Sequence, residues 1–532
     1  MSKRLVRLIS VLLVASLIAI ACSGNDGFEA TPTGPDAGVA DSGSGATDGD
    51  DGSGGSGADV DLPTTDDDTD DDSGTPGAST GSLRWATCGE LECADLDVPV
   101  DHLDDDGSTL RIAVGRLPAR GEPIGVLVVN PGGPGGSGLE FLAAFSSFFP
   151  SDLRVFDIVS FDPRGVGDSE PSFRCGDDGE QLSILSSIDD EVDTPAETGL
   201  AEAAAALCVE TMGEVAGLLH TEYVARDMDV LRSALGEEQI SYLGFSYGSV
   251  IGTWYASLFP DRVRAMVLDG ASDPIDPSST TEERVASDLD EIETFGVLLD
   301  RAIAACDDPG CVMWNDGDPV QLYLDAVAKF DLVAAETEDN PLAGPLGLIT
   351  TLYGEDSWFL LYQGVADLAL ADDPTVFASL ARFQIPDPSQ PSFTAHVNCL
   401  DDWVHEGHVT RVERLADSTA LTAVLEEEQP LLAALGIETV STCPFYDQFA
   451  PAPLSIELDG GDVPILVIGN PNDPATPFVE SEGLALDTLS NGRLLEVEHP
   501  SHTVYPDNDC VNNWVHAVLI DLVNPSERRV SC

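Results

Sequence analysis

Residues 240–258 read ISYLGFSYGSVIGTWYASL, and this stretch decides the fold. Its first four residues are mostly apolar, as in a buried strand, and Ser249–Leu258 is typical of a helix. Between them lies GFSYG, a G-x-S-x-G pattern, in which small residues allow a sharp turn from strand to helix. The turn places the serine hydroxyl at the helix N-terminus, where the dipole and free N–H groups favour negative charge. The stretch therefore predicts a nucleophilic serine at Ser246, against the alternative of a structural Gly-Ser turn.

Other strands are expected on both sides of this one. From Trp85 onward, short β-branched runs alternate with helical stretches, which predicts an α/β fold with a mostly parallel sheet. Most of the expected strands are nearly all apolar, as strands covered on both faces should be. They are Gly125–Asn130, Phe156–Phe161, Ile240–Gly244, Ala265–Leu268 and Pro464–Ile468. In such sheets the reacting groups follow the carboxyl ends of the strands.

A glycine-rich loop, NPGGPGGSG at residues 130–138, follows the first of these strands. Its spacing partly fits a dinucleotide-binding fingerprint, but Pro134 removes a backbone donor and no acidic partner for a ribose is evident. Because the loop lies upstream of the serine turn, it fits an oxyanion loop better. We expect the backbone N–H groups of Gly133 and Tyr247 to bind the oxygen of a tetrahedral intermediate.

The acid of a serine triad is expected after the serine in the chain. Asp473 follows the strand Pro464–Ile468 in a proline-stiffened turn, which is suited to orienting an imidazole. Asp462 precedes that strand and Asp487 lies in an expected helix, so both are weaker candidates.

The base is expected among three histidines near the end of the chain. His516 lies in the helical run 512–523, and His499 ends a strand-like run and is followed by proline. His502 stands in the loop beyond that strand, where a general base must reach back over the sheet. We therefore predict His502 as the base, with His499 as its rival.

With these motifs in this order, the chain resembles the bacterial tripeptidyl aminopeptidase family, exported α/β-hydrolases related to prolyl iminopeptidases. The resemblance covers about residues 83–532. It rests on NPGGPGGSG (130–138), FDPRGVGDS (161–169), GFSYG within 235–270, NDPATP (472–477) and SHT (501–503), with Cys510 just beyond. It implies an α/β-hydrolase fold with Ser246 as nucleophile, Asp473 as acid and His502 as base.

The sequence departs from the family pattern in two ways. Ser501 stands where the family usually has glycine, and lysine is almost absent. Two charged residues of the FDPRGVGDS motif, Asp162 and Arg164, are expected to brace nearby loops through ion pairs rather than to take part in the chemistry.

Residues 272–451 separate the serine half of the core from the strand of the acid, far more than an ordinary connection. The segment contains amphipathic runs, so we expect a large helical lid inserted between two core segments, 81–271 and 452–532. An aminopeptidase must hold a free α-ammonium group, and a buried carboxylate does that best. The candidates are Asp401, Asp402 and Glu355, each of which can also be an ordinary surface acid.

The 532 residues include 95 acidic and 23 basic side chains, for a formal charge of −72. A surface this negative repels phosphate backbones and anionic lipid, which argues against nucleic-acid binding. Lys329 follows alanine rather than glycine, so no Walker A phosphate loop is present. Hydrophobic residues make up 43% of the chain, enough to build a core.

Residues 1–22 have the layout of a secretory signal peptide, with basic residues before an apolar run. The run ends in AIAC, which resembles a lipobox and predicts lipidation of Cys22; ordinary secretory cleavage is the alternative. Residues 23–80 are rich in Gly, Ser and Asp and predict a disordered acidic linker. We expect an extracytoplasmic lipoprotein of the cell envelope, or a secreted protein, with membrane contact only through the lipid.

Ten cysteines follow Cys22, and an even number in an exported chain indicates disulfides. Order along the chain suggests that neighbours pair. The expected pairs are Cys88–Cys93, Cys175–Cys208, Cys306–Cys311, Cys399–Cys443 and Cys510–Cys532. No CxxC pair or HExxH helix appears, so we expect no zinc or other metal site.

Together these features predict an exported serine exopeptidase that removes di- or tripeptides from free N-termini through an acyl-enzyme, without a cofactor. An esterase or lipase is the alternative on the same triad, because the triad determines acyl transfer but not the leaving group. A third reading is a binding lipoprotein with a vestigial site. The intact Ser246, Asp473 and His502 argue against it.

Overall fold

The computed structural model describes residues 83–532, except for several segments within this range. The segments left out are 105, 147–148, 175, 177–205, 209, 276–280, 338–342, 385–392, 395, 402–419, 422–423, 426 and 436–455. The predicted signal peptide and linker, and the predicted lipidation site Cys22, lie outside the described residues. So do Asp402, Cys175 and Cys443.

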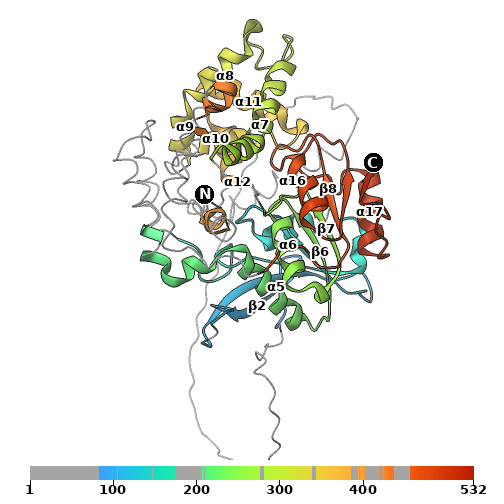
Figure 1. Ribbon diagram of the computed structural model, residues 1–532. Coiled ribbons are helices and arrows are strands. Elements are labelled where there is room, and N and C mark those ends of the chain that lie inside the picture. Colours follow the sequence, from blue (N-terminus) through green and yellow to red (C-terminus); the bar gives the residue numbers. More distant parts are fainter. Residues whose placement is uncertain are drawn as a thin grey trace, which may run out of the picture. The chain divides into compact units, whose positions relative to one another are not determined.

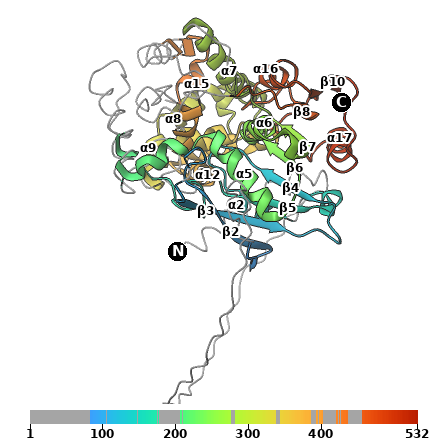
Figure 2. The same cartoon turned by 60° about the horizontal axis from the view of Figure 1, so that its bottom comes forward.

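The described residues contain a ten-stranded sheet in the order β1-β2-β3-β5-β4-β6-β7-β8-β9-β10. The strands are β1 (Ala86–Cys88), β2 (Leu91–Pro99), β3 (Thr109–Leu117), β4 (Val126–Asn130), β5 (Asp157–Phe161), β6 (Ile240–Phe245), β7 (Val263–Asp269), β8 (Ile465–Gly469), β9 (Gly492–Glu496) and β10 (Arg529–Ser531). β1, β2, β3 and β5 pair antiparallel, whereas β5 to β10 pair in parallel along the sheet. Figure 2 shows β2 and β3, in blue, on the side of the sheet next to β5 and β4. The predicted mostly parallel α/β sheet is confirmed.

Helices cover both faces of the sheet. These are α2 (Gly138–Phe145), α5 (Thr221–Leu235), α6 (Gly248–Leu258), α16 (Phe478–Gly483) and α17 (Asp509–Leu519), with the short helices η1 (Ser151–Val155), η2 (Gly213–Leu218), η3 (Pro260–Arg262) and η8 (Leu484–Thr488). Successive residues of β4 point to opposite faces, because side chains alternate along a strand. Val126 and Val128 pack in a cluster with residues of α5 and α6, and Leu127 and Val129 pack in a second cluster with residues of α2 and α17. Both faces of the central strands are therefore buried, which explains their continuous apolar runs.

Segments far apart in sequence lie side by side in this sheet. β8 pairs with β7 although 195 residues separate Asp269 from Ile465 (465 − 269 − 1). Figure 1 shows the red C-terminal segment with β8 beside the green β6 and β7. The end of the chain thus completes the sheet that the serine half begins.

In the segment between β7 and β8, every named element of the described residues is a helix. Its helices are α7 (Thr281–Ala305), η4 (Asn315–Gly317), α8 (Pro319–Val327), α9 (Phe330–Glu336), α10 (Ala343–Thr350), η5 (Glu355–Ser357), α11 (Trp358–Ala371), α12 (Thr375–Gln384) and α15 (Pro430–Ala433). They share an apolar cluster of their own, which includes the fully buried Leu299, Tyr323 and Phe377. Figure 1 shows α7 to α11 gathered as one group of helices. Within the described part of the chain, no helix is both long and apolar enough to cross a membrane.

Candidate active site

Ser246 occupies the turn between β6 and α6. Its backbone φ is 55°, in the left-handed region, and its N–H donates to the carbonyl of Asp269 at 3.0 Å. A non-glycine residue in this region is uncommon and marks a turn held by its surroundings. Gly244 is required here, because a Cβ at this position would overlap the carbonyl of Gly248. The strand–turn–helix context predicted from the sequence is present.

The glycine-rich loop lies against this turn. A Cβ on Gly132 would lie 2.9 Å from both the Cβ of Ser246 and the backbone nitrogen of Tyr247. The side-chain oxygen of Asn130 accepts the Gly132 N–H at 2.9 Å and holds the loop at the end of β4. Gly132 is therefore the residue that touches the turn, and Gly133, the predicted oxyanion donor, follows it directly.

Asp473 and His502 are in direct contact. The Nδ1 of His502 lies 2.7 Å from Oδ1 of Asp473, which is almost fully buried in the turn after β8. The carboxylate also accepts the N–H groups of Ala475 (2.9 Å) and Thr476 (3.0 Å) and the hydroxyl of Thr476 (2.9 Å). Because an ionised carboxylate can only accept, His502 donates from Nδ1, and its Nε2 is left as an acceptor. Nε2 is buried and has no hydrogen-bond partner among the described residues.

The loop that carries His502 is held by two residues that the sequence reading missed. The side-chain amide of Asn470 donates to the carbonyls of His499 (2.8 Å) and Ser501 (2.6 Å). The carboxylate of Asp269 accepts backbone N–H groups just beyond His502. Both Asp269 and Asn470 are polar residues at the ends of apolar strands, the same signal that pointed to Asp473. The same strand-end pattern in the sequence therefore marks both residues.

The rival residues are placed differently. His499 Nδ1 lies 2.7 Å from the hydroxyl of Ser501, and His516 on α17 contacts the hydroxyl of Tyr505 at 3.1 Å. Asp462 precedes β8, and Asp487 lies in η8. Of the predicted acids and histidines, the structure brings together Asp473 and His502.

Arg164 and Asp162 brace the loops around the site, but by different means. The guanidinium of Arg164 forms two hydrogen bonds to the buried Asp227 on α5, at 2.7 and 2.8 Å. Asp162 accepts from the hydroxyl of Ser137 (2.7 Å) and from the backbone N–H of Asp168 (2.8 Å), and burial raises its pKa. The expected ion pair is thus present for Arg164, whereas hydrogen bonds serve for Asp162 in the described part of the chain.

Two of the three predicted amine-binding acids lie within the described residues. Asp401 accepts the N–H (2.9 Å) and hydroxyl (2.5 Å) of Thr221 and the hydroxyl of Tyr247 (3.1 Å). Burial raises the pKa of Asp401 to about 6. Glu355 pairs with Arg301 at 2.5 Å, and both side chains are more than a third exposed. The carboxylate of Asp401 is therefore hydrogen-bonded to core residues, whereas the side chain of Glu355 is partly exposed to solvent.

The lid also contacts the predicted base and the loop that carries it. The carbonyl of Tyr353 accepts the N–H of His502 at 3.0 Å, and the ring of Tyr353 meets the imidazole edge-on at 5.6 Å between centroids. Gly354 forms an antiparallel bridge with Ser501, and the N–H of Glu355 donates to the carbonyl of Pro500 at 3.0 Å. No sequence signal identified Tyr353, because its role depends on contact between distant segments.

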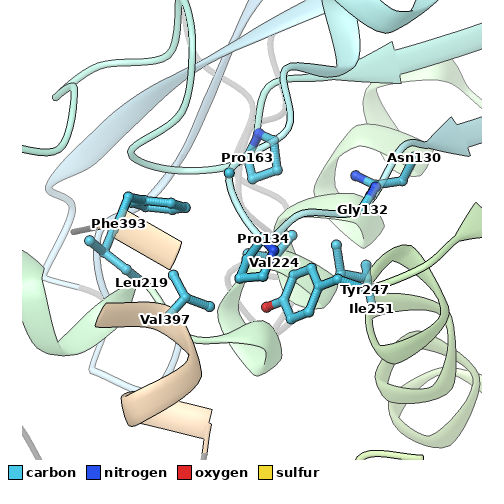
Figure 3. Close-up of a pocket in the computed structure, with 11 residues that line it drawn as sticks. Asn130, Gly132, Pro134, Pro163, Leu219, Val224, Tyr247, Ile251, Phe393 and Val397 are labelled. Atoms are coloured by element: carbon cyan, nitrogen blue, oxygen red, sulfur yellow. The ribbon is translucent and has the colours of Figure 1, made fainter. Parts of the chain in front are cut away.

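A small apolar pocket lies beside the serine turn. It is lined by Asn130, Gly132, Pro134, Gly135, Pro163, Leu219, Val224, Tyr247, Ile251, Phe393 and Val397. Figure 3 shows the ring of Tyr247 pointing toward Val397, which belongs to the inserted segment. Core and lid therefore both contribute walls next to Ser246.

Three of the expected neighbour pairs are disulfides in the structure. They are Cys88–Cys93, Cys306–Cys311 and Cys510–Cys532. Cys208 and Cys399 are also disulfide-bonded. Their expected partners, Cys175 and Cys443, lie outside the described residues.

Comparison with known proteins places the chain in a family. A family model described as an alpha/beta hydrolase fold matches residues 125–295, and one described as TAP-like protein matches residues 430–532. Serine protease Hip1 of Mycobacterium tuberculosis is 31% identical over 491 residues, which cover 83% of this chain and 89% of the relative.

Two further relatives match over similar lengths. Tripeptidyl aminopeptidase of Streptomyces lividans is 29% identical over 479 residues, 83% of this chain and 85% of its own. Carboxylesterase B of Mycobacterium tuberculosis is 30% identical over 477 residues, 84% of this chain and 90% of its own. Because the sheet is that of an α/β-hydrolase and these relatives match over most of the chain, we conclude that the chain belongs to the tripeptidyl aminopeptidase family of α/β-hydrolases.

Proposed function

We propose that the protein is an exported serine aminopeptidase that releases short peptides, di- or tripeptides, from free N-termini through an acyl-enzyme. The observation that carries the proposal is the 2.7 Å contact between Asp473 and His502, together with Ser246 in the left-handed turn after β6. Relatives named serine protease and tripeptidyl aminopeptidase support the peptidase activity.

The reaction follows from the placement of these groups. Ser246 Oγ attacks the scissile carbonyl while Nε2 of His502 takes its proton, and Asp473 holds the imidazole with Nδ1 protonated. The imidazolium then protonates the leaving amine, and water attacks the acyl-enzyme by the same proton transfers in reverse. No metal or organic cofactor enters these steps.

The N–H groups of Gly133 and Tyr247 are the proposed donors to the oxyanion. The contact of Gly132 with Ser246 and Tyr247 supports this assignment, because it brings the loop to the serine turn. Each such donor is typically worth about 3 kcal/mol of barrier.

Recognition of the free N-terminus needs a carboxylate within reach of the substrate. Of the proposed residues, Glu355 is favoured, because its side chain is accessible and its backbone is bonded to the loop of the base. Asp401 shares its oxygens between Thr221 and Tyr247, which leaves it less able to bind an ammonium group. Asp402 is retained as a candidate on its sequence position alone.

The N-terminal segment supports an extracytoplasmic location. A secretory leader at residues 1–22, lipidation at Cys22 and an acidic linker at 23–80 would tether the hydrolase outside the cytoplasm. The disulfides of the described residues fit an oxidising compartment.

An esterase is the second candidate, favoured by the relative named carboxylesterase B. The proposed triad serves both reactions, because it transfers an acyl group whichever atom leaves. What separates the two functions is whether the enzyme requires a free amine on its substrate.

A substrate panel with the full chain tests the proposal. Tripeptidyl coumarin amides with a free amine should be cleaved at least about 100-fold faster than the same peptides N-acetylated, because removing one partner of a charge pair that the bound substrate buries costs about 2–5 kcal/mol. Equal turnover of free and blocked peptides would overturn the exopeptidase assignment. Hydrolysis of p-nitrophenyl esters with no cleavage of any peptide would establish the esterase instead.

Ser246→Ala is the control variant for this panel. A fluorophosphonate probe should label the wild type and spare Ser246→Ala, while both keep the same melting temperature. Equal labelling of the two proteins would end the nucleophile assignment.

A further inference from the structure

Asp269 is a buried carboxylate that the proposed reaction does not use. It is the last residue of β7, which pairs in parallel with β6 on one side and with β8 on the other. β6 leads into Ser246, and β8 leads into Asp473. Asp269 is fully buried between the two strands that carry the nucleophile and the acid.

The backbone of Asp269 is hydrogen-bonded to the serine turn, and its side chain is hydrogen-bonded to the loop of His502. Its backbone carbonyl accepts the N–H of Ser246 at 3.0 Å. Its carboxylate accepts the N–H of Val504 at 3.1 and 3.2 Å and the N–H of Tyr505 at 2.7 Å. Val504 and Tyr505 follow His502 by two and three residues. One residue therefore joins the serine turn to the loop of the base.

Gly270, the next residue, lies against the imidazole itself. Its φ is +61°, and a Cβ there would lie 3.1 Å from Cε1 of His502 and 3.1 Å from its carbonyl oxygen. Cε1 is bonded to Nε2, the nitrogen that accepts the serine proton. The corner formed by Asp269 and Gly270 thus lies under the ring that must reach Ser246.

We propose that Asp269 is a positioning residue, which together with Gly270 sets the place of the His502 imidazole relative to Ser246. The inference rests on the proposed triad and adds a part to it. Asp473 binds Nδ1 and orients the ring, whereas Asp269 fixes the backbone from which the ring projects. A misplacement of about 1 Å in such a group can cost 100-fold in rate.

Asp269→Asn tests this role. The remaining amide oxygen can accept both N–H groups from the place of Oδ2, but the NH2 group that replaces Oδ1 cannot accept and lies against the N–H of Val504. We expect kcat on the best peptide substrate to fall about 10- to 100-fold with KM within about twofold of wild type. A purely structural role would lower the amount of folded enzyme and leave kcat per active site, titrated with the fluorophosphonate, unchanged.

Asp157→Asn is the matched control. Asp157 also accepts a backbone N–H, that of Ala119 at 2.8 Å, but at the opposite end of the sheet, where β5 begins. The kcat of the Asp157→Asn enzyme should stay within about twofold of the wild-type value. An equal fall of kcat in both variants, or wild-type kcat in Asp269→Asn, would overturn the proposal.

A double variant separates this proposal from the triad itself. If Asp269 acts through His502, adding Asp269→Asn to His502→Ala should leave the residual rate unchanged, whereas a further tenfold fall would show an independent role and overturn the inference. Full activity of His502→Ala alone would overturn the proposed function instead.

If the Asp269→Asn variant does not fold, Gly270→Ala tests the proposed positioning role instead. The added methyl pushes on the imidazole and its carbonyl, so kcat should fall about tenfold or more at unchanged KM. Wild-type kcat in a folded Gly270→Ala enzyme would refute the role of this corner.

Discussion

The core and the lid hold their residues by different means. In the core, β6, β7 and β8 are hydrogen-bonded neighbours, so the register of one sheet sets Ser246, Asp269 and Asp473. The lid helices pack around an apolar cluster of their own. They reach the core site through single segments, such as Tyr353 at His502 and Asp401 at Thr221. We infer from this difference that the sheet sets the proposed reacting groups and that the lid influences the choice of substrate.

The largest expected effect lies in the core. Asp473→Asn should lower kcat about 10⁴-fold, because the amide no longer selects the His502 tautomer with Nδ1 protonated. Steady-state kinetics on a free tripeptidyl coumarin amide measure this loss. Asp462→Asn, at the start of β8, is the control and should keep wild-type kcat. A loss in the control as large as in Asp473→Asn would remove the distinction between the two acids.

The core residues were also the ones that the sequence could predict. Ser246 lies in a local pattern, and Asp473 and His502 follow apolar strands near the end of the chain, so each is visible within about ten residues of sequence. Asp269 also follows an apolar strand, so its position is visible in the sequence, but its role and that of Tyr353 depend on partners 235 and 149 residues away (504 − 269 and 502 − 353). Local patterns can propose the groups that react, but tertiary contacts determine the groups that hold them in place.

A smaller effect, confined to one class of substrate, is expected in the lid. If the bound peptide covers the Glu355 carboxylate, Glu355→Gln should lower kcat/KM about 100-fold for free peptides, since removing one partner of a buried charge pair costs about 2–5 kcal/mol. For an N-acetylated peptide or a simple ester the same change should have little effect. Asp372→Asn is a matched control, because Asp372 is a lid acid in an ion pair, with Lys329 at 2.6 Å.

The substrates affected by Glu355→Gln distinguish two roles for this side chain. A loss on free and blocked substrates alike would show that Glu355 supports the loop of His502 rather than the substrate. If kcat/KM on free peptides is unchanged, Glu355 does not bind the amine, and Asp402 and Asp401 remain as the candidates.

The smallest effect is expected where lid and core meet, at Asp401, and it concerns stability. Burial raises the pKa of Asp401 from 3.8 to about 6. The folded state therefore binds this proton more tightly than the unfolded state, and the stability gained is complete below about pH 4 and lost as the pH rises through 6. The difference of about two pKa units corresponds to about 3 kcal/mol over the whole titration, of which about 2 kcal/mol is lost between pH 4.5 and pH 7.

Asp401→Asn carries no titrating group at this position, so its free energy of unfolding should fall less between pH 4.5 and pH 7 than that of the wild type, by about 2 kcal/mol. Urea unfolding at the two pH values measures the difference. Asp372→Asn again serves as control, since an exposed lid acid should leave the wild-type slope unchanged. Parallel pH dependence of Asp401→Asn and wild type would mean that folding does not raise the pKa of Asp401. The bonds of Asp401 to Thr221 and to Tyr247, the residue next to the proposed nucleophile, would then join lid and core without making the stability depend on pH.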